Sequence, residues 1–227
     1  MFVEVPSRRR HGFNWVTPTL VLASVAIFVW LSLLEPAAHN EVLRRWGAIR
    51  PLEEDMATLL QRLRWTASLF TALMIHADWS HLVGNLLFLL IFGMPSERAL
   101  GGLRFLALFV VVGVLANLVG VVALENPRAA VVGCSGAVSG LIGAYLALFP
   151  RSKLGFVVPL GVVLEFVRTP ASVMIGIWAL LQIGFTLIGP GLGAVAWAAH
   201  IGGFLLGLLW GVLSRPAVAR RLRRGMV

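Results

Sequence analysis

GCSGAVSGLIGAYLALF, residues 133–149, places two serines, one cysteine and four glycines in a stretch that is otherwise apolar. Residues 135–149 are apolar enough to enter a bilayer, but a lipid-facing helix needs roughly 20 residues to cross it. Small residues are favoured where helices pack closely inside a membrane bundle. The stretch therefore predicts a short span that other helices shield from lipid.

The whole chain has the composition of a membrane protein. Of its 227 residues, 59% are hydrophobic and 13% are charged, and the mean hydropathy is +0.89, outside the usual range of soluble domains. The second apolar run is short like the fourth, so we expect it to be shielded as well. The pattern predicts an all-α polytopic bundle of six transmembrane helices at Val16–Leu34, His81–Met94, Phe105–Leu124, Ser135–Phe149, Ala171–Ile188 and Leu192–Leu213.

The charged residues predict how this bundle is oriented. Most of the 19 Lys and Arg residues share one side if the N-terminus is cytoplasmic, as the positive-inside rule requires. The net charge of +9 is then explained by topology and by attraction of a basic tail to the lipid bilayer. A nucleic-acid partner is not expected, because no soluble basic module is visible. We expect a multi-pass protein of a bacterial inner membrane with both termini in the cytoplasm.

Three parts are expected along the chain. Residues 1–13 form a cytoplasmic tail, residues 14–213 the six-helix domain, and residues 214–227 a basic cytoplasmic tail. Within the domain, residues 35–79 mix charges with apolar residues near helical spacing, which predicts a segment in the outer interface. Residues 150–170 are expected to be a partly interfacial connector on the inner side.

Four polar side chains from three spans are predicted to lie at comparable depth in the outer half of the membrane. His81 and Asn85 belong to the second span, Ser135 begins the fourth, and His200 lies about two turns into the sixth. Each alone has an ordinary explanation: a serine bonded to its own helix, an interhelical amide, or a packing or proton-relay histidine. Polar groups inside spans are nevertheless costly, and their convergence indicates a functional site.

These residue types are the parts needed for acyl transfer. A serine hydroxyl becomes a good nucleophile when a neutral imidazole accepts its proton, and burial keeps His200 neutral. The negative oxygen of the intermediate needs preorganised donors. The Ser135 backbone N–H, His81 and Asn85 are candidates, the last two because i and i+4 share a helix face. No acidic residue is placed at this depth, so the sequence predicts a Ser–His dyad.

Glycines surround both halves of the predicted dyad. Gly133 and Gly136 leave room for backbone or substrate to approach Ser135. Small faces let two membrane helices come close together, as a Ser–His hydrogen bond requires. The two predicted small faces are Gly136, Gly140 and Gly143 on the fourth span, and Gly203, Gly207 and Gly211 on the sixth.

Nearly the whole chain resembles the rhomboid family of intramembrane serine proteases. The resemblance rests on HADWSHLVGN, FGMPSERALGG, GCSG and AHIGGFLLG, in the order of the family. It implies a six-helix protease that cuts single-span membrane-protein substrates near the outer face, at small, helix-weakening residues. By resemblance, the nucleophile is Ser135, the base is His200, the oxyanion stabilisers are His81 and Asn85, and the supporting residues include His76 and Glu97.

The chain departs from the family pattern at two places. A Trp-Arg pair that often precedes the first histidine motif occurs here in reverse order, as Arg64 and Trp65. One turn after the nucleophile, where some relatives place an aromatic that stacks on the base, this chain has Ser139.

Other functions are weighed against a protease. A metal site of His76, His81 and His200 lacks the carboxylate base of H-E-x-x-H motifs, so neither a metal nor another cofactor is expected. Cys134 is a conceivable nucleophile, but a thiol with an ordinary pKa is usually inert. A catalytically silent rhomboid-like scaffold remains an alternative, although both residues of the dyad are present. A transporter is disfavoured because internal repeats are not visible.

Overall fold

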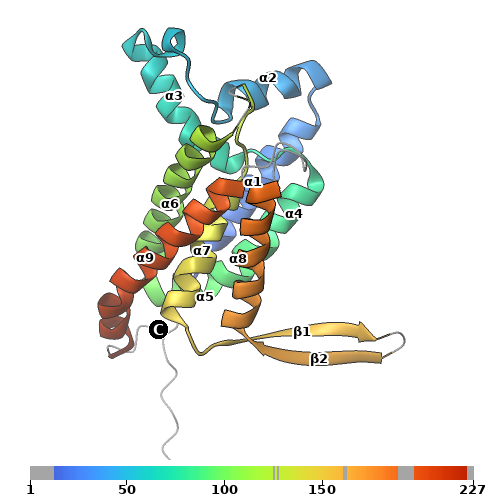
Figure 1. Ribbon diagram of the computed structural model, residues 1–227, viewed down its shortest axis with the longest axis vertical. Coiled ribbons are helices and arrows are strands. Elements are labelled where there is room, and N and C mark those ends of the chain that lie inside the picture. The colour runs from blue at the N-terminus through green and yellow to red at the C-terminus, as the bar shows by residue number, and fades with distance from the viewer. Residues whose placement is uncertain (1–12, 125, 127, 161–162, 189–196, 224–227) are drawn as a thin grey trace, which may run out of the picture.

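The computed structural model describes residues 13–124, 126, 128–160, 163–188 and 197–223, and it shows a helical bundle with one two-stranded sheet (Figure 1). Within these residues, three helical segments are long and apolar enough to cross a membrane, Trp79–Leu100, Gly102–Ala123 and Trp197–Arg223. Three shorter apolar helices, Val16–Ser32, Ser135–Leu148 and Ala171–Phe185, correspond to the other predicted spans. The predicted all-α membrane bundle is confirmed.

The six apolar segments carry these labels in Figure 1. The first is α1 (Val16–Ser32), and the second is continuous through α4 (Trp79–Phe88), the π-helical turn η3 (Leu89–Gly93) and α5 (Met94–Leu100). The remaining four are α6 (Gly102–Ala123), α7 (Ser135–Leu148), α8 (Ala171–Ile188) and α9 (Trp197–Arg223). The predicted start of the last span, Leu192, lies outside the described residues.

Helix α7 lies at the centre of the bundle, as its small residues predict. Every residue from Gly136 to Tyr145 is buried, and α7 packs most extensively against α9 and α6. A Cβ added at Gly203 would overlap the Gly136 carbonyl, and one added at Gly207 would overlap the Gly140 carbonyl. The close approach of the two glycine faces is therefore confirmed.

The second span is shielded less than predicted. Val83, Leu87 and Leu90 are exposed on its surface, and the segment has 22 residues. It begins before His81 and continues past Met94 into a polar end that hydropathy alone does not recognise. Its apparent shortness reflects polar residues within a full-length helix.

Glu97, in the polar end of the second span, packs against the start of α1. Its carboxylate, only 2% exposed, accepts hydrogen bonds from the backbone N–H groups of Trp15, Val16 and Thr17 at 2.8–2.9 Å and from the Thr17 hydroxyl at 2.7 Å. Helix N-termini carry unpaired N–H groups and a positive dipole end. The buried carboxylate accepts from these N–H groups and places a negative group at the positive end of the dipole, so it joins α1 to the second span.

Residues 35–79 are largely helical and lie at the end of the bundle opposite the sheet (Figure 1). They form α2 (Pro36–Trp46), η1 (Glu53–Met56), α3 (Leu59–Thr71) and η2 (Ala72–Met74). Trp65 donates its indole N–H to the Ile49 carbonyl at 2.9 Å. A bridge between Ala48 and Val131 connects this segment to the loop before α7.

The predicted connector at 150–170 is a β-hairpin. Strands β1 (Lys153–Leu160) and β2 (Val163–Pro170) pair antiparallel, with Lys153 opposite Pro170. The valine and phenylalanine content favours strands over an irregular connector. At the basic end of the chain, α9 stays helical to Arg223. The Arg215 and Arg221 side chains donate hydrogen bonds to the carbonyls of Ala147 and Ala99.

Candidate active site

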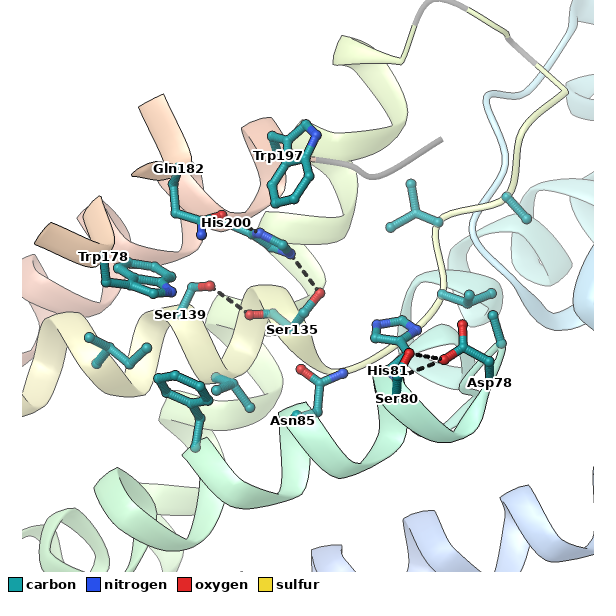
Figure 2. Close-up of a pocket in the computed structure, with 18 of the residues that line it drawn as sticks. Asp78, Ser80, His81, Asn85, Ser135, Ser139, Trp178, Gln182, Trp197 and His200 are labelled. Carbon is teal, nitrogen blue, oxygen red and sulfur yellow. Dashed lines mark hydrogen bonds between the residues drawn. The ribbon is translucent and has the colours of Figure 1, made fainter. Parts of the chain in front are cut away.

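A cavity of about 790 Å³ lies where α4, α7, α8 and α9 meet beneath the loop before α7. Its lining includes the four side chains that the sequence predicts to converge, His81, Asn85, Ser135 and His200 (Figure 2). The structure therefore brings together groups that are up to 119 positions apart in the sequence, counted from His81 to His200.

Ser135 and His200 are within hydrogen-bond distance. Ser135 is the first residue of α7, and its Oγ lies 2.9 Å from the Nε2 of His200. His200 lies about one turn into the described part of α9, which begins at Trp197. The glycine contacts below it hold α9 near α7, which keeps the two side chains in reach of one another.

The other ring nitrogen of His200 is occupied by a residue that the sequence analysis did not assign. Gln182 on α8 places its Oε1 2.7 Å from His200 Nδ1, and its side chain is only 8% exposed. Ser139 does not replace the missing aromatic, because its hydroxyl donates to the Ser135 carbonyl at 2.7 Å. The available signal was a lone amide within an apolar span.

His81 and Asn85 lie below Ser135 on α4 (Figure 2). A Cβ at Gly133 would stand 2.5 Å from the His81 ring and 3.4 Å from Asn85 Nδ2. Gly133 has a φ of +98°, a left-handed conformation that glycine adopts without penalty. Within the described structure the buried Asn85 Nδ2 has no hydrogen-bond acceptor. The glycine thus lets the loop cross directly over both side chains.

Asp78 fixes the start of α4. Its carboxylate accepts hydrogen bonds from the Ser80 hydroxyl and, at 2.8 Å, from the His81 backbone N–H. Both bonds lower the pKa of the exposed Asp78 carboxyl, and the bond from Ser80 has the larger effect. Asp78 is therefore an ionised N-cap at neutral pH, and it sets the first turn from which His81 projects.

His76 and Cys134 form a buried layer behind the cavity. Both side chains are 0% exposed, and His76 Nε2 lies 3.6 Å from the Cys134 sulfur. The His76 ring packs edge-on against His81 with centroids 5.3 Å apart. A fully buried thiol is disfavoured as a thiolate, which weakens Cys134 as a candidate nucleophile.

The described residues contain no group of three His, Cys, Asp or Glu side chains arranged to hold a metal ion. The two ring nitrogens of His200 face Ser135 and Gln182, whereas His76 faces Cys134. His200 and His76 therefore have separate partners.

Comparison with known proteins gives the family. Residues 63–217 match the Rhomboid domain. The chain belongs to the rhomboid family. The matched residues include the segments that carry His81, Asn85, Ser135 and His200.

This rhomboid is similar to plant and bacterial proteins at low identity. It is 26% identical to RHOMBOID-like protein 6, mitochondrial, of Arabidopsis thaliana, covering 88% of this chain and 68% of that protein. It is 35% identical to Rhomboid-like protein 11, chloroplastic, of the same plant, over 66% of this chain and 53% of that one. Rhomboid protease GluP of Bacillus subtilis is 27% identical over 87% of this chain and 34% of that protease.

Proposed function

We propose that this rhomboid is an intramembrane serine endopeptidase that hydrolyses peptide bonds in or near the transmembrane segments of single-span membrane proteins. The observation that carries the proposal is the 2.9 Å approach of Ser135 Oγ and His200 Nε2 inside a cavity of the bundle. Nucleophile and base within hydrogen-bond reach are the signature of nucleophilic catalysis.

In the proposed reaction, Ser135 Oγ attacks the carbonyl carbon of the scissile peptide while its proton passes to His200 Nε2. The C–N bond then breaks, and the leaving nitrogen takes the proton from His200. Water attacks the resulting ester through the same base, which releases the carboxylate product and restores Ser135. Each proton thus moves between the substrate, the serine and one imidazole.

The negative oxygen of the tetrahedral intermediate needs donors on the side of Ser135 opposite the base. We assign this role to the Ser135 backbone N–H at the start of α7, to His81 and to Asn85. The support is the position of both side chains against Gly133 and the buried Asn85 amide without an acceptor in the described residues. An unpaired buried donor is costly in the resting protein and is satisfied when the oxyanion forms.

We also propose that both termini lie on the cytoplasmic side and that the site opens toward the outer half of the membrane. The distribution of basic residues supports this orientation. The similar proteins include ones named for mitochondria and chloroplasts and one from Bacillus subtilis. Location in a bacterial inner membrane therefore stays a prediction from the sequence. Reporter fusions at each terminus test the orientation, and an extracytoplasmic reporter signal at either terminus contradicts it.

The test of the function is proteolysis by the purified full chain in liposomes that contain a single-span substrate. Wild type and Ser32→Ala, a matched control whose hydroxyl is exposed on α1 and bonds only to the nearby Val29 carbonyl among the described contacts, should cut the substrate. Ser135→Ala should leave it intact. Binding of the substrate without cleavage by wild type would instead favour the catalytically silent scaffold.

A further inference from the structure

Gln182 contacts His200 but takes no part in the proposed reaction steps. It lies on α8, within a helix otherwise made of apolar and small residues near this point, and its side chain is buried. Its Oε1 is 2.7 Å from His200 Nδ1, on the side of the ring opposite the 2.9 Å contact between Nε2 and Ser135 (Figure 2). The imidazole is therefore held at both nitrogens.

The identity of the atom facing Nδ1 decides the tautomer of His200. An amide oxygen only accepts, so the proton of a neutral ring sits on Nδ1, and Nε2 keeps its lone pair. That lone pair is what accepts the Ser135 proton. The opposite tautomer would carry its proton on Nε2 and donate it to Ser135, which blocks proton transfer.

Other groups around the cavity do not provide this acceptor. The titratable groups among its described lining residues are Asp78, His81 and His200 itself, and Asp78 binds Ser80 and the His81 backbone. The ring of Trp197 meets His200 edge-on, with centroids 5.7 Å apart and an angle of 89°. This contact restricts ring motion but accepts no proton.

We propose that Gln182 is a positioning residue that fixes the orientation and the productive tautomer of His200. The residue acts through His200 and does not contact the reacting bond. In this role it corresponds to the third member of a serine-protease triad, supplied here by a neutral amide from a third helix. The inference rests on the proposed protease function, because it concerns the base of that reaction.

The test compares Gln182→Met with Gln182→Glu in the full-length protein. Methionine keeps the length and approximate volume of glutamine, but its thioether sulfur is a much weaker hydrogen-bond acceptor for the Nδ1–H than an amide oxygen. Loss of one neutral hydrogen bond to the base should lower kcat on the order of 10-fold, with a smaller change in KM. The matched control is Leu180→Met, which introduces the same side chain at a position on α8 that is 69% exposed.

Gln182→Glu separates positioning from general packing. A carboxylate oxygen still accepts from Nδ1, so kcat should exceed that of Gln182→Met. Its negative charge also favours the protonated imidazole, so the acid limb of the kcat–pH profile should move to higher pH by roughly one unit. If Gln182 only filled space, the glutamate variant would show neither the higher kcat nor the shifted acid limb relative to Gln182→Met. Thermal melts of each variant confirm that the fold is kept.

The two proposals fail in different ways. If wild type and Ser135→Ala are equally inactive on every substrate, the protease function is wrong. If wild type is active and Ser135→Ala is not, while Gln182→Met retains the wild-type kcat and pH profile, the function stands and the role of Gln182 is overturned. Identical profiles for the methionine and glutamate variants also overturn it.

Discussion

Replacing Gly207 by alanine should separate the two helices that carry the proposed dyad. Gly207 lies two turns after His200 on α9, and an added Cβ would stand 2.5 Å from Gly140 Cα and overlap the Gly140 carbonyl. Carbon atoms in contact prefer about 3.5–4.0 Å, so the helices must move apart by about 1 Å. A rigid shift of that size would stretch the 2.9 Å contact of Ser135 with His200 beyond hydrogen-bond range.

The expected cost follows from two opposing effects. Overpacking of a tight interface typically costs about 1–3 kcal/mol, whereas glycine to alanine inside a helix gains up to about 1 kcal/mol. Gly176→Ala on α8 is the matched control, because a Cβ there has no atom within 4 Å. The helix-propensity gain is common to both variants, so their stabilities should differ by about 1–3 kcal/mol.

The assay is equilibrium unfolding in detergent together with the turnover of a single-span substrate. Gly207→Ala should be less stable than Gly176→Ala and should lose most of its activity, whereas Gly176→Ala should keep both. Equal stability and full turnover of the two variants would refute the argument that contact between α7 and α9 sets the Ser–His geometry.

Three further outcomes are expected. Glu97→Ala should lower the free energy of unfolding by about 3 kcal/mol or more, because it leaves the buried N–H groups of α1 unpaired; an unchanged melt contradicts this. Asp78→Ala should lower the free energy of unfolding by about 1 kcal/mol at pH 7, because the N-cap of α4 is lost. Because the pKa of Asp78 is lowered, this difference should vanish as the pH falls through that value, and a difference that persists at acidic pH argues against the cap. Activity should be unaffected by a chelator, and its loss would point to a metal.

Much of the helical architecture was predictable because its signals are local in the sequence. Apolar runs give the spans, and glycines four residues apart on two of them give the close approach of α7 and α9. The convergence of Ser135 with His200 followed from the depth of each residue within its span. These inferences need only hydropathy, spacing and the alternation of span direction.

The features that were missed depend on partners elsewhere in the chain. Gln182 contacts His200 because α8 is rotated to face the cavity, and a single amide in an apolar span does not reveal that rotation. The second span was predicted to be short and shielded because Glu97 made its end look polar in the sequence. In the structure the helix continues through Glu97, whose carboxylate is buried by the start of α1. The hairpin of β1 and β2 was missed because its residues are apolar like the spans beside them.

The most direct test of the central claim is a turnover series on Ser135→Ala, His200→Ala and the double variant, each first shown to be folded by thermal melt. If the two side chains act in one proton-transfer step, either single change should remove nearly all activity, and the double variant should lose little more, because residues that act as a unit are not additive. Independent losses that multiply in the double variant, or substantial turnover without Ser135, would contradict the account.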